Sequence, residues 1–268
     1  MIVSNNEELE GLMRAGRAVA AARDAMLAAV RPGITTLELD QIGERTLHGY
    51  GAVSGPRTMY NFPGGTCVSL NSCVAHGIPG MTLIREGDIV NVDVSAELDG
   101  FYSDTGATIV AGTKVGAHRN FSEHDQYADK LKVLAASERS LFAAIAKARA
   151  GSKMSEIGRA VLREAQKDGF TVIKNLTGHG IGRKLHEEPG HIFSYPDPKE
   201  RRLLKKGYVL AIEPFVSTAA QYIHESDDGW GLLVPDQSIV AQFEHTIVVT
   251  ENEAIILTLS EHEHVKSL

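Results

Sequence analysis

The two halves of this chain repeat one order of features, and this repetition constrains its fold more than any other property. Equivalent residues recur at offsets of 118 to 120 positions, in the pairs Gly33 and Gly151, Gly51 and Gly169, and Asp93 and Glu213. The letters "HGI" occur at His76 and again at His179, an offset of 103, so each half carries an insertion at a different place. The alternative is chance similarity between amphipathic helices. Four matches in one order favour a duplicated structural unit.

Each half is predicted to contain two amphipathic helices followed by strands. The helices are expected over residues 7–30, with Asn6 as the cap, and over Thr36–His48, Lys130–Arg149 and Ser155–Lys167. No linker rich in Pro, Gly and Ser separates the halves. We therefore expect one domain over residues 1–268, with halves of about 1–112 and 127–260. The halves should share a sheet, in which acids from equivalent strands face each other.

Composition excludes several classes of protein. A hydrophobic content of 43% and a charged content of 23% are ordinary for a globular protein, and the net charge of −7 argues against a general nucleic-acid surface. No apolar run has the length of a membrane span, and the acidic N-terminus is unlike a secretory signal. Two cysteines, Cys67 and Cys73, are too few for a disulfide framework. These properties predict a soluble, cytoplasmic protein.

The segment "IVNVDVSAELDGFYSDTGATIV" reads as two strands joined by a tight turn at Asp99 and Gly100. In that register Ser95 lies opposite Asp104, so Asp93 and Asp104 project from one face as a diagonal pair. Such neighbours have Cα atoms roughly 7–8 Å apart, within reach of a common ion. The alternative is a pair of solvated hairpin acids, which the apolar neighbours disfavour.

Three further polar residues occupy apolar stretches: His179 in "LTGHGIG", Glu213 in "VLAIEPFV" and Glu244 in "AQFEHTIVVT". A buried Glu can instead pair with a Lys or Arg, and a lone His is more often structural. Together with Asp93 and Asp104, however, these residues form an oxygen-rich set with about the ligand count that two divalent ions require. Fe, Mn, Co and Zn all suit such ligands. Two such ions can hold a bridging hydroxide and polarise a carbonyl, which indicates hydrolysis of an amide or ester.

With these residues identified, the chain resembles the type I methionine aminopeptidases of the pita-bread metallopeptidase family. The likeness covers nearly the whole sequence, and its most specific motifs are "CVSLNSCVAHGIPG", "GDIVNVDVSAELDGFYSDTGATIV", "GHGIGRKLHEEP", "AIEPFV" and "QFEHTIVVT". The resemblance implies an α+β pita-bread fold, with pseudo-two-fold duplicated helix–helix–strand halves around a central antiparallel sheet and helices on its outer face. It also implies removal of the initiator methionine from nascent proteins and peptides with a small second residue.

The resemblance assigns roles to the candidate residues. The implied ligands are Asp93 for one ion, Asp104 and Glu244 for both, and His179 with Glu213 for the other. Glu213 would also assist proton transfer at the water held between the ions. His76 and His186 would stay unligated, contact the scissile peptide and stabilise the tetrahedral intermediate.

The resemblance also implies a pocket for the methionine side chain, and this sequence departs from the family there. The residues implied around the thioether are Met59, Tyr60, Phe62, Cys67, Leu185 and Trp230. An aromatic residue is usual at Met59, a His is common at Tyr60, and a Phe is typical at Leu185. These departures concern selectivity and leave the ligand set intact. The stretch 114–126 is longer than the usual connection.

The expected partner is the N-terminus of a peptide or of a nascent chain near the ribosome, with no nucleic acid, no membrane and a monomeric state. Three alternative functions are compared with this one. A pita-bread peptidase that cleaves Xaa-Pro bonds would need the same ligands but usually carries a large N-terminal domain. A non-catalytic pita-bread protein would typically have lost ligand positions. A purely structural α/β scaffold would leave the clustered acids unexplained.

Overall fold

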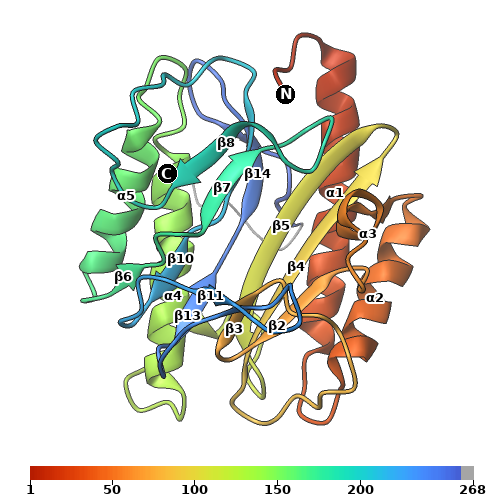
Figure 1. Ribbon diagram of the computed structural model, residues 1–268, viewed down its shortest axis with the longest axis vertical. Coiled ribbons are helices and arrows are strands. Elements are labelled where there is room, and N and C mark those ends of the chain that lie inside the picture. The colour runs from red at the N-terminus through yellow and green to blue at the C-terminus, as the bar shows by residue number, and fades with distance from the viewer. Residues whose placement is uncertain (261–268) are drawn as a thin grey trace.

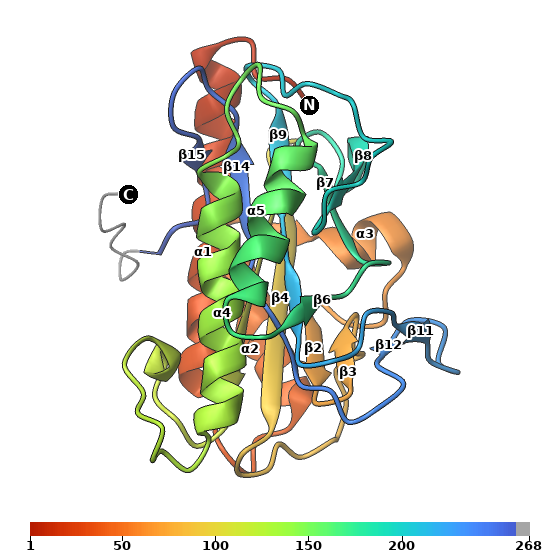
Figure 2. The ribbon, with the colours of Figure 1, turned by 90° about the vertical axis from the view of Figure 1, so that its left-hand side faces the viewer.

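Long helices cover one side of a set of antiparallel strands, and this arrangement leaves the other side open for a site. The structure is a computed structural model and describes residues 1–260. In Figure 2 the four long helices stack on one side of the strands, and the short helix α3 lies on the other. The helices are α1 (Asn6–Ala29), α2 (Thr36–Gly49), α3 (Gly55–Tyr60), α4 (Ala128–Ile145) and α5 (Ser155–Gln166), with the 3-10 turn η1 (Ala117–Arg119).

The longest strands, β4 (Ile89–Leu98) and β5 (Phe101–Val110), form the hairpin that the sequence predicts. Ser95 pairs with Asp104, so the predicted register is confirmed. Asp99 and Gly100 have φ angles of 53° and 80°. Two consecutive positive φ values are the geometry of a two-residue hairpin turn, which Asp-Gly favours. The turn therefore fixes the face from which the acids of β4 and β5 project.

Shorter strands complete the sheets. In the N-terminal half, β1 (Val53–Ser54) and β2 (Cys67–Leu70) pair with β4, and β3 (Cys73–Ala75) pairs with β12. In the C-terminal half the strand order is β15-β14-β9-β7-β8, and every pairing is antiparallel. The strands are β6 (Thr171–Val172), β7 (Thr177–Gly180), β8 (Glu187–Phe193), β9 (Val209–Ile212), β10 (Phe215–Ser217), β11 (His224–Glu225), β12 (Leu232–Leu233), β13 (Val240–Gln242), β14 (His245–Val248) and β15 (Ile255–Ile256).

The two halves of the chain lie side by side and meet where β5 runs along β13 and β14 (Figure 1). Across this junction the Glu244 amide donates to the Gly106 carbonyl at 2.8 Å. The Thr105 hydroxyl donates to the Glu244 carbonyl at 2.8 Å, and the Asp104 amide donates to the Thr246 hydroxyl at 2.9 Å. These bonds place the acids of the first hairpin beside those of the second half.

The four predicted long helices are present, with small differences at their ends. The cap of α1 is Asn5, which accepts from the Glu8 amide at 2.9 Å, and the prediction of Asn6 is wrong by one position. Helix α4 ends at Ile145, before the predicted Arg149. After the helix, the Ala148 amide donates to the Ile145 carbonyl in a tighter turn. The Ala150 amide then donates to the Thr250 carbonyl, a bond to a distant segment that helical periodicity does not reveal.

The long stretch 114–126 packs against α4. His118 is buried, and its Nε2 lies 3.1 Å from Glu138, which also accepts hydrogen bonds from Nε and Nη2 of Arg119. Although burial opposes the charge of Glu138, these two partners lower its pKa to about 2. These ion pairs with Glu138 therefore attach the stretch 114–126 to α4.

Among residues 1–260, none of the helices combines the length and the apolar character that crossing a bilayer requires.

Candidate metal centre

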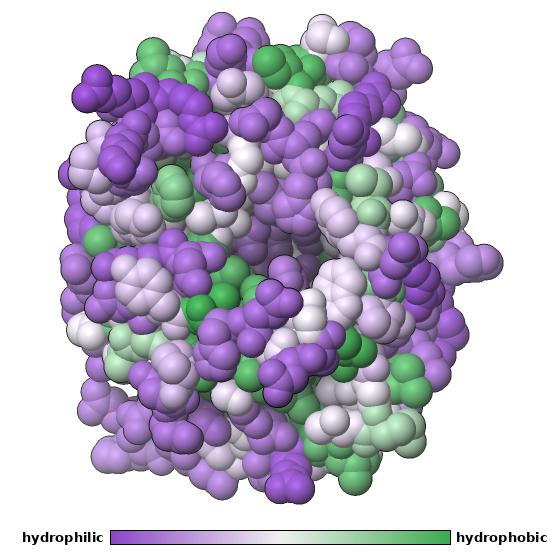
Figure 3. Space-filling view, viewed as in Figure 1, coloured by the Kyte–Doolittle hydropathy of each residue, from purple (hydrophilic) through white to green (hydrophobic). Residues whose placement is uncertain are grey.

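Three of the sequence-predicted ligands meet at the junction between the halves. One ligand atom from each of Asp104, His179 and Glu244 lies within 4.8 Å of the others, and all three side chains are buried. They come from β5, from β7 and from the break between β13 and β14. This junction lies on the open face of Figure 1, where Figure 3 shows a central hollow walled mainly by hydrophilic residues.

Glu213 and Asp93 join the same cluster. Glu213 follows β9 directly, and its Oε1 lies 3.5 Å from His179 Nε2. Asp104 Oδ2 lies 4.0 Å from the same nitrogen. Asp93 lies close enough for its charge to raise the pKa of Asp104, as the shared face of the hairpin predicts. The structure thus brings all five residues together, including pairs more than a hundred positions apart.

The cluster is electrostatically unfavourable without a cation. Burial, and then the charge of neighbouring carboxylates, raises the pKa of Asp104, Glu213 and Glu244 well above the usual range. Burial raises the pKa of Asp93 to about 6. No Lys or Arg among residues 1–260 forms an ion pair with these four acids.

Two carboxylate oxygens at the centre of the cluster are unsatisfied. Asp104 Oδ1 and Glu244 Oε1 are fully buried and have no hydrogen-bond partner within residues 1–260. Buried polar atoms in native proteins almost always have a partner, and a site for a bound ion is one explanation for an exception. Hard carboxylate oxygens with an imidazole suit divalent cations. The residues present therefore fit a metal ion.

His179 is prepared to act as a ligand. Its Nδ1 lies 3.0 Å from the carbonyl of Gly180, an acceptor, so Nδ1 carries the proton and Nε2 offers a lone pair toward the acids. Burial, with a smaller effect of His186, lowers the pKa of His179 to about 3, so the ring is neutral at physiological pH. A neutral imidazole with a fixed tautomer is the form that binds metals.

The other two predicted histidines lie at the mouth of the cluster. The ring of His186 lies 4.0 Å from that of His179, between centroids. His76 is close enough to lower the pKa of both. The side chains of His76 and His186 are accessible to solvent, yet the walls around them desolvate both rings. This desolvation lowers the pKa of His76 and, with His76 nearby, lowers that of His186 to about 4. Two neutral imidazoles therefore face any molecule that enters the cluster from solvent.

The residues predicted for the methionine pocket are placed unevenly. Phe62 is buried and meets Trp230 edge to face, with ring centroids 5.1 Å apart. Cys67 is buried and pairs with Asp93 across β2 and β4, so their side chains share one face. The remaining three residues differ: Met59 and Tyr60 are exposed on α3, while Leu185 packs in a cluster with Leu12 and Phe101 of the core.

Sequence reasoning did not identify the residues that hold Glu244 in place. Gln242 Nε2 donates to Glu244 Oε2 at 3.0 Å, and Asn91 Nδ2 donates to Gln242 Oε1 at 2.8 Å. A Cβ at Gly106 would lie 2.3 Å from Gln242 Oε1, so only glycine leaves room for this chain of amides. Asn91 and Gln242 each precede a candidate ligand by two residues, and this alternation is the sequence signal that could have revealed them.

Replacement of Gln242 by Leu should weaken metal binding while preserving the fold. The substitution keeps a side chain of similar size and removes the donor to Glu244, and loss of such a partner typically costs 10–100-fold in metal affinity. Titration calorimetry with Mn²⁺ measures this change. Gln237→Leu, an exposed substitution of the same type, serves as the control and should leave the affinity unchanged. Equal affinities in both variants would show that the amide chain does not support the ligand.

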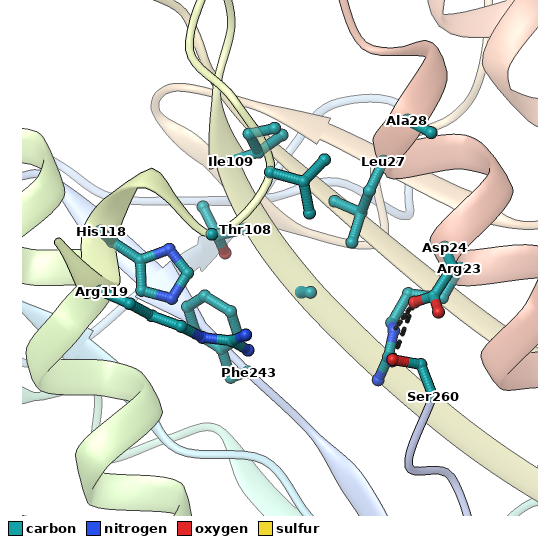
Figure 4. A pocket seen from close by; sticks show the side chains of 13 residues that line it. Arg23, Asp24, Leu27, Ala28, Thr108, Ile109, His118, Arg119, Phe243 and Ser260 are labelled. Atoms are coloured by element: carbon teal, nitrogen blue, oxygen red, sulfur yellow. Dashed lines mark hydrogen bonds and ion pairs between the residues drawn. The ribbon is translucent and has the colours of Figure 1, made fainter. Parts of the chain in front are cut away.

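A separate cavity of about 210 Å³ lies on the helix side of the strands (Figure 4). Its walls come from α1, β5, the stretch 114–126 and Phe243, and they include Leu27, Ile109 and Arg119. None of the five clustered residues lines it. This cavity is therefore distinct from the acid cluster, although Phe243 is adjacent to Glu244 in the chain.

Comparison with known proteins gives one consistent result. The model of metallopeptidase family M24 matches residues 10–251. The chain is 51% identical over 259 residues to methionine aminopeptidase 2 of Bacillus subtilis, covering 96% of this chain and 99% of that protein. A crystal structure of methionine aminopeptidase from Rickettsia prowazekii superposes with a TM-score of 0.87 at 32% identity, covering 97% of this chain and 100% of the other.

The prolidase from Pyrococcus furiosus has the same fold, with a TM-score of 0.73 at 22% identity over 97% of this chain and 66% of that protein. This likeness concerns the fold alone. The predicted α+β pita-bread architecture of antiparallel strands and covering helices is confirmed by these neighbours.

Proposed function

We propose that this chain, which belongs to metallopeptidase family M24, is a type I methionine aminopeptidase that removes the N-terminal methionine from peptides with a small second residue. One observation carries the chemistry: Asp104 and Glu244 bury carboxylate oxygens that lack any partner among the described residues, beside a histidine in the ligand tautomer. The methionine specificity is supported by the relatives, which are methionine aminopeptidases by name and match this chain along nearly its full length.

The proposed ligands are those expected from the sequence. Asp93 would hold one divalent ion, Asp104 and Glu244 would hold both, and His179 with Glu213 would hold the other. Fe, Mn, Co and Zn are the candidate ions. When bound, they would supply Lewis acidity toward the peptide carbonyl and lower the pKa of an attacking water.

The protein's own groups would complete the reaction. The carboxylate of Glu213 would accept a proton from the attacking water and return it to the leaving amine. His76 and His186 lie at the mouth of the cluster as neutral rings, and each can donate one N–H to the peptide oxygen as negative charge develops there.

A side-chain pocket beside the acids would determine which residue is removed. Phe62, Trp230 and the thiol of Cys67 would contact the thioether, since aromatic rings and a flexible sulfur-containing chain pack well together. Met59, Tyr60 and Leu185 complete the proposed set. The substrate would be a free peptide or a nascent chain near the ribosome. We further propose a monomer in the cytoplasm, a location supported by two thiols that remain free.

The test compares peptides that begin Met-Ala with peptides that begin Xaa-Pro, each with and without a chelator. The proposal requires rapid release of methionine from the first set and loss of that activity on chelation. Cleavage of the Xaa-Pro set alone would identify a prolidase-like enzyme. Turnover of neither set by Mn²⁺-saturated protein would contradict the assignment as a peptidase.

A further inference from the structure

Tyr60 contacts one of the two histidines at the mouth of the cluster. Its hydroxyl lies 2.7 Å from Nδ1 of His186, although the residues are 126 positions apart. The two rings are tilted by 58° with centroids 5.5 Å apart, so they do not stack. The close contact is made by the hydroxyl group. The contact is therefore a directed hydrogen bond.

Local structure holds both partners of this bond. The Ser54 side chain caps α3 by accepting from the Arg57 amide, and the Thr58 hydroxyl donates to the Ser54 carbonyl at 2.7 Å. Asn61 ends the helix in the left-handed conformation, with φ 56°. On the other side, the His186 ring lies against the His179 ring at 4.0 Å. The backbone that carries Tyr60 and the ring of His186 are thus both held by their neighbours.

We propose that Tyr60 is a positioning residue for His186, whose hydroxyl donates to Nδ1 and thereby keeps the ring proton on Nε2. The inference rests on the proposed peptidase function. It also changes the role expected for Tyr60, from a wall of the methionine pocket to a group that acts through His186.

The direction of the bond follows from the chemistry of the two groups. A neutral imidazole has one N–H and one acceptor nitrogen, and the bond at one nitrogen decides which tautomer is present. A phenol is a strong neutral donor and its oxygen is a weak acceptor, while the bare imidazole nitrogen is a strong acceptor. Donation from Tyr60 to Nδ1 is therefore favoured, and it leaves Nε2–H as the only donor of His186.

This tautomer matters because His186 can assist the reaction only as a donor. The peptide oxygen is an acceptor in the substrate and a stronger one in the tetrahedral intermediate. Without Tyr60 the ring would divide between two tautomers and rotate more freely. The loss would therefore concern the transition state more than substrate binding, and kcat should fall while KM stays nearly constant.

Tyr60→Phe tests the proposal, because it keeps the ring and removes only the hydroxyl. We expect kcat on a Met-Ala peptide to fall about tenfold, the effect of one hydrogen bond, with KM changed less than about twofold. Tyr50→Phe, an exposed tyrosine at the end of α2, is the matched control and should retain full kcat. An unchanged kcat, or an increase in KM alone, would overturn the proposal and return Tyr60 to the pocket wall.

A second measurement does not depend on turnover. Nitrogen-15 NMR of histidine-labelled, zinc-loaded protein reports which ring nitrogen carries the proton. The expected spectrum shows His186 protonated at Nε2 in the natural protein and mixed tautomers in Tyr60→Phe. Protonation at Nδ1 in the natural protein would overturn the proposal. Failure of the proposed function would appear separately, as a natural protein that cleaves no Met-Ala peptide whatever its tautomer.

Discussion

Asp104→Asn should stabilise the metal-free protein and at the same time abolish its peptidase activity. In the metal-free state Asp104 repels Asp93, Glu213 and Glu244, and a neutral amide of the same shape removes that repulsion. We expect the free energy of unfolding at pH 8 to rise by about 1–2 kcal/mol, since replacing a buried charged group with a neutral one of similar volume often stabilises the folded protein. Activity should fall by about a thousandfold, because a proposed ligand to both ions is worth several kcal/mol to the transition state.

Denaturant unfolding in the presence of chelator and peptide assays with Mn²⁺ measure the two effects. Asp99→Asn is the matched control, because it makes the same chemical change at the exposed turn of the same hairpin. That variant should change neither quantity appreciably. Destabilisation of the metal-free protein by Asp104→Asn, or activity close to normal, would contradict the view that this carboxylate exists to bind a cation.

The metal-free protein should become less stable as the pH rises, and Mn²⁺ should reverse this trend. Burial raises the pKa of Asp93 from an ordinary 3.8 to about 6 in the folded state. The stability contributed by its neutral form is complete below 3.8 and is lost as the pH rises through about 6. For Asp93 alone the gap corresponds to about 3 kcal/mol. The other three acids extend the loss to higher pH, because their pKa values are raised further.

Bound Mn²⁺ should change the sign because metal ions bind the deprotonated ligands. Unfolding curves between pH 4.5 and 8, with chelator or with saturating Mn²⁺, would show opposite slopes for the two states. Glu244→Gln should flatten the slope of the metal-free protein, whereas Glu253→Gln, an exposed substitution, should not. Metal-free stability that increases across this range would show that the acids are ionised and compensated in some other way.

The hairpin and its pair of acids could be predicted because local chemistry determines them. Asp99 and Gly100 tolerate the positive φ values of a two-residue turn, and the turn sets the register of every pair along β4 and β5. Amphipathic periodicity likewise located the four long helices to within a few residues. Both signals depend on neighbours close in sequence.

Contacts between distant segments could not be predicted in the same way. The segment that follows α4 bonds to Thr250 through the Ala150 amide, and the bond between Tyr60 and His186 joins different halves of the chain. The packing of Leu185 with Leu12 and Phe101 likewise becomes visible only in three dimensions. Sequence motifs identified which residues gather, while the partners that orient them required coordinates. Two statements remain predictions: that the clustered residues bind metal, and that the chain forms a single domain.

Anomalous diffraction from crystals soaked in Mn²⁺ tests the central claim most directly. The account predicts two anomalous peaks per chain at the junction of the halves, both within coordination distance of Asp104 and Glu244, with His179 and Glu213 at one and Asp93 at the other. A saturating soak that leaves no peak at these residues, or places manganese elsewhere while the five side chains stay unligated, would contradict it.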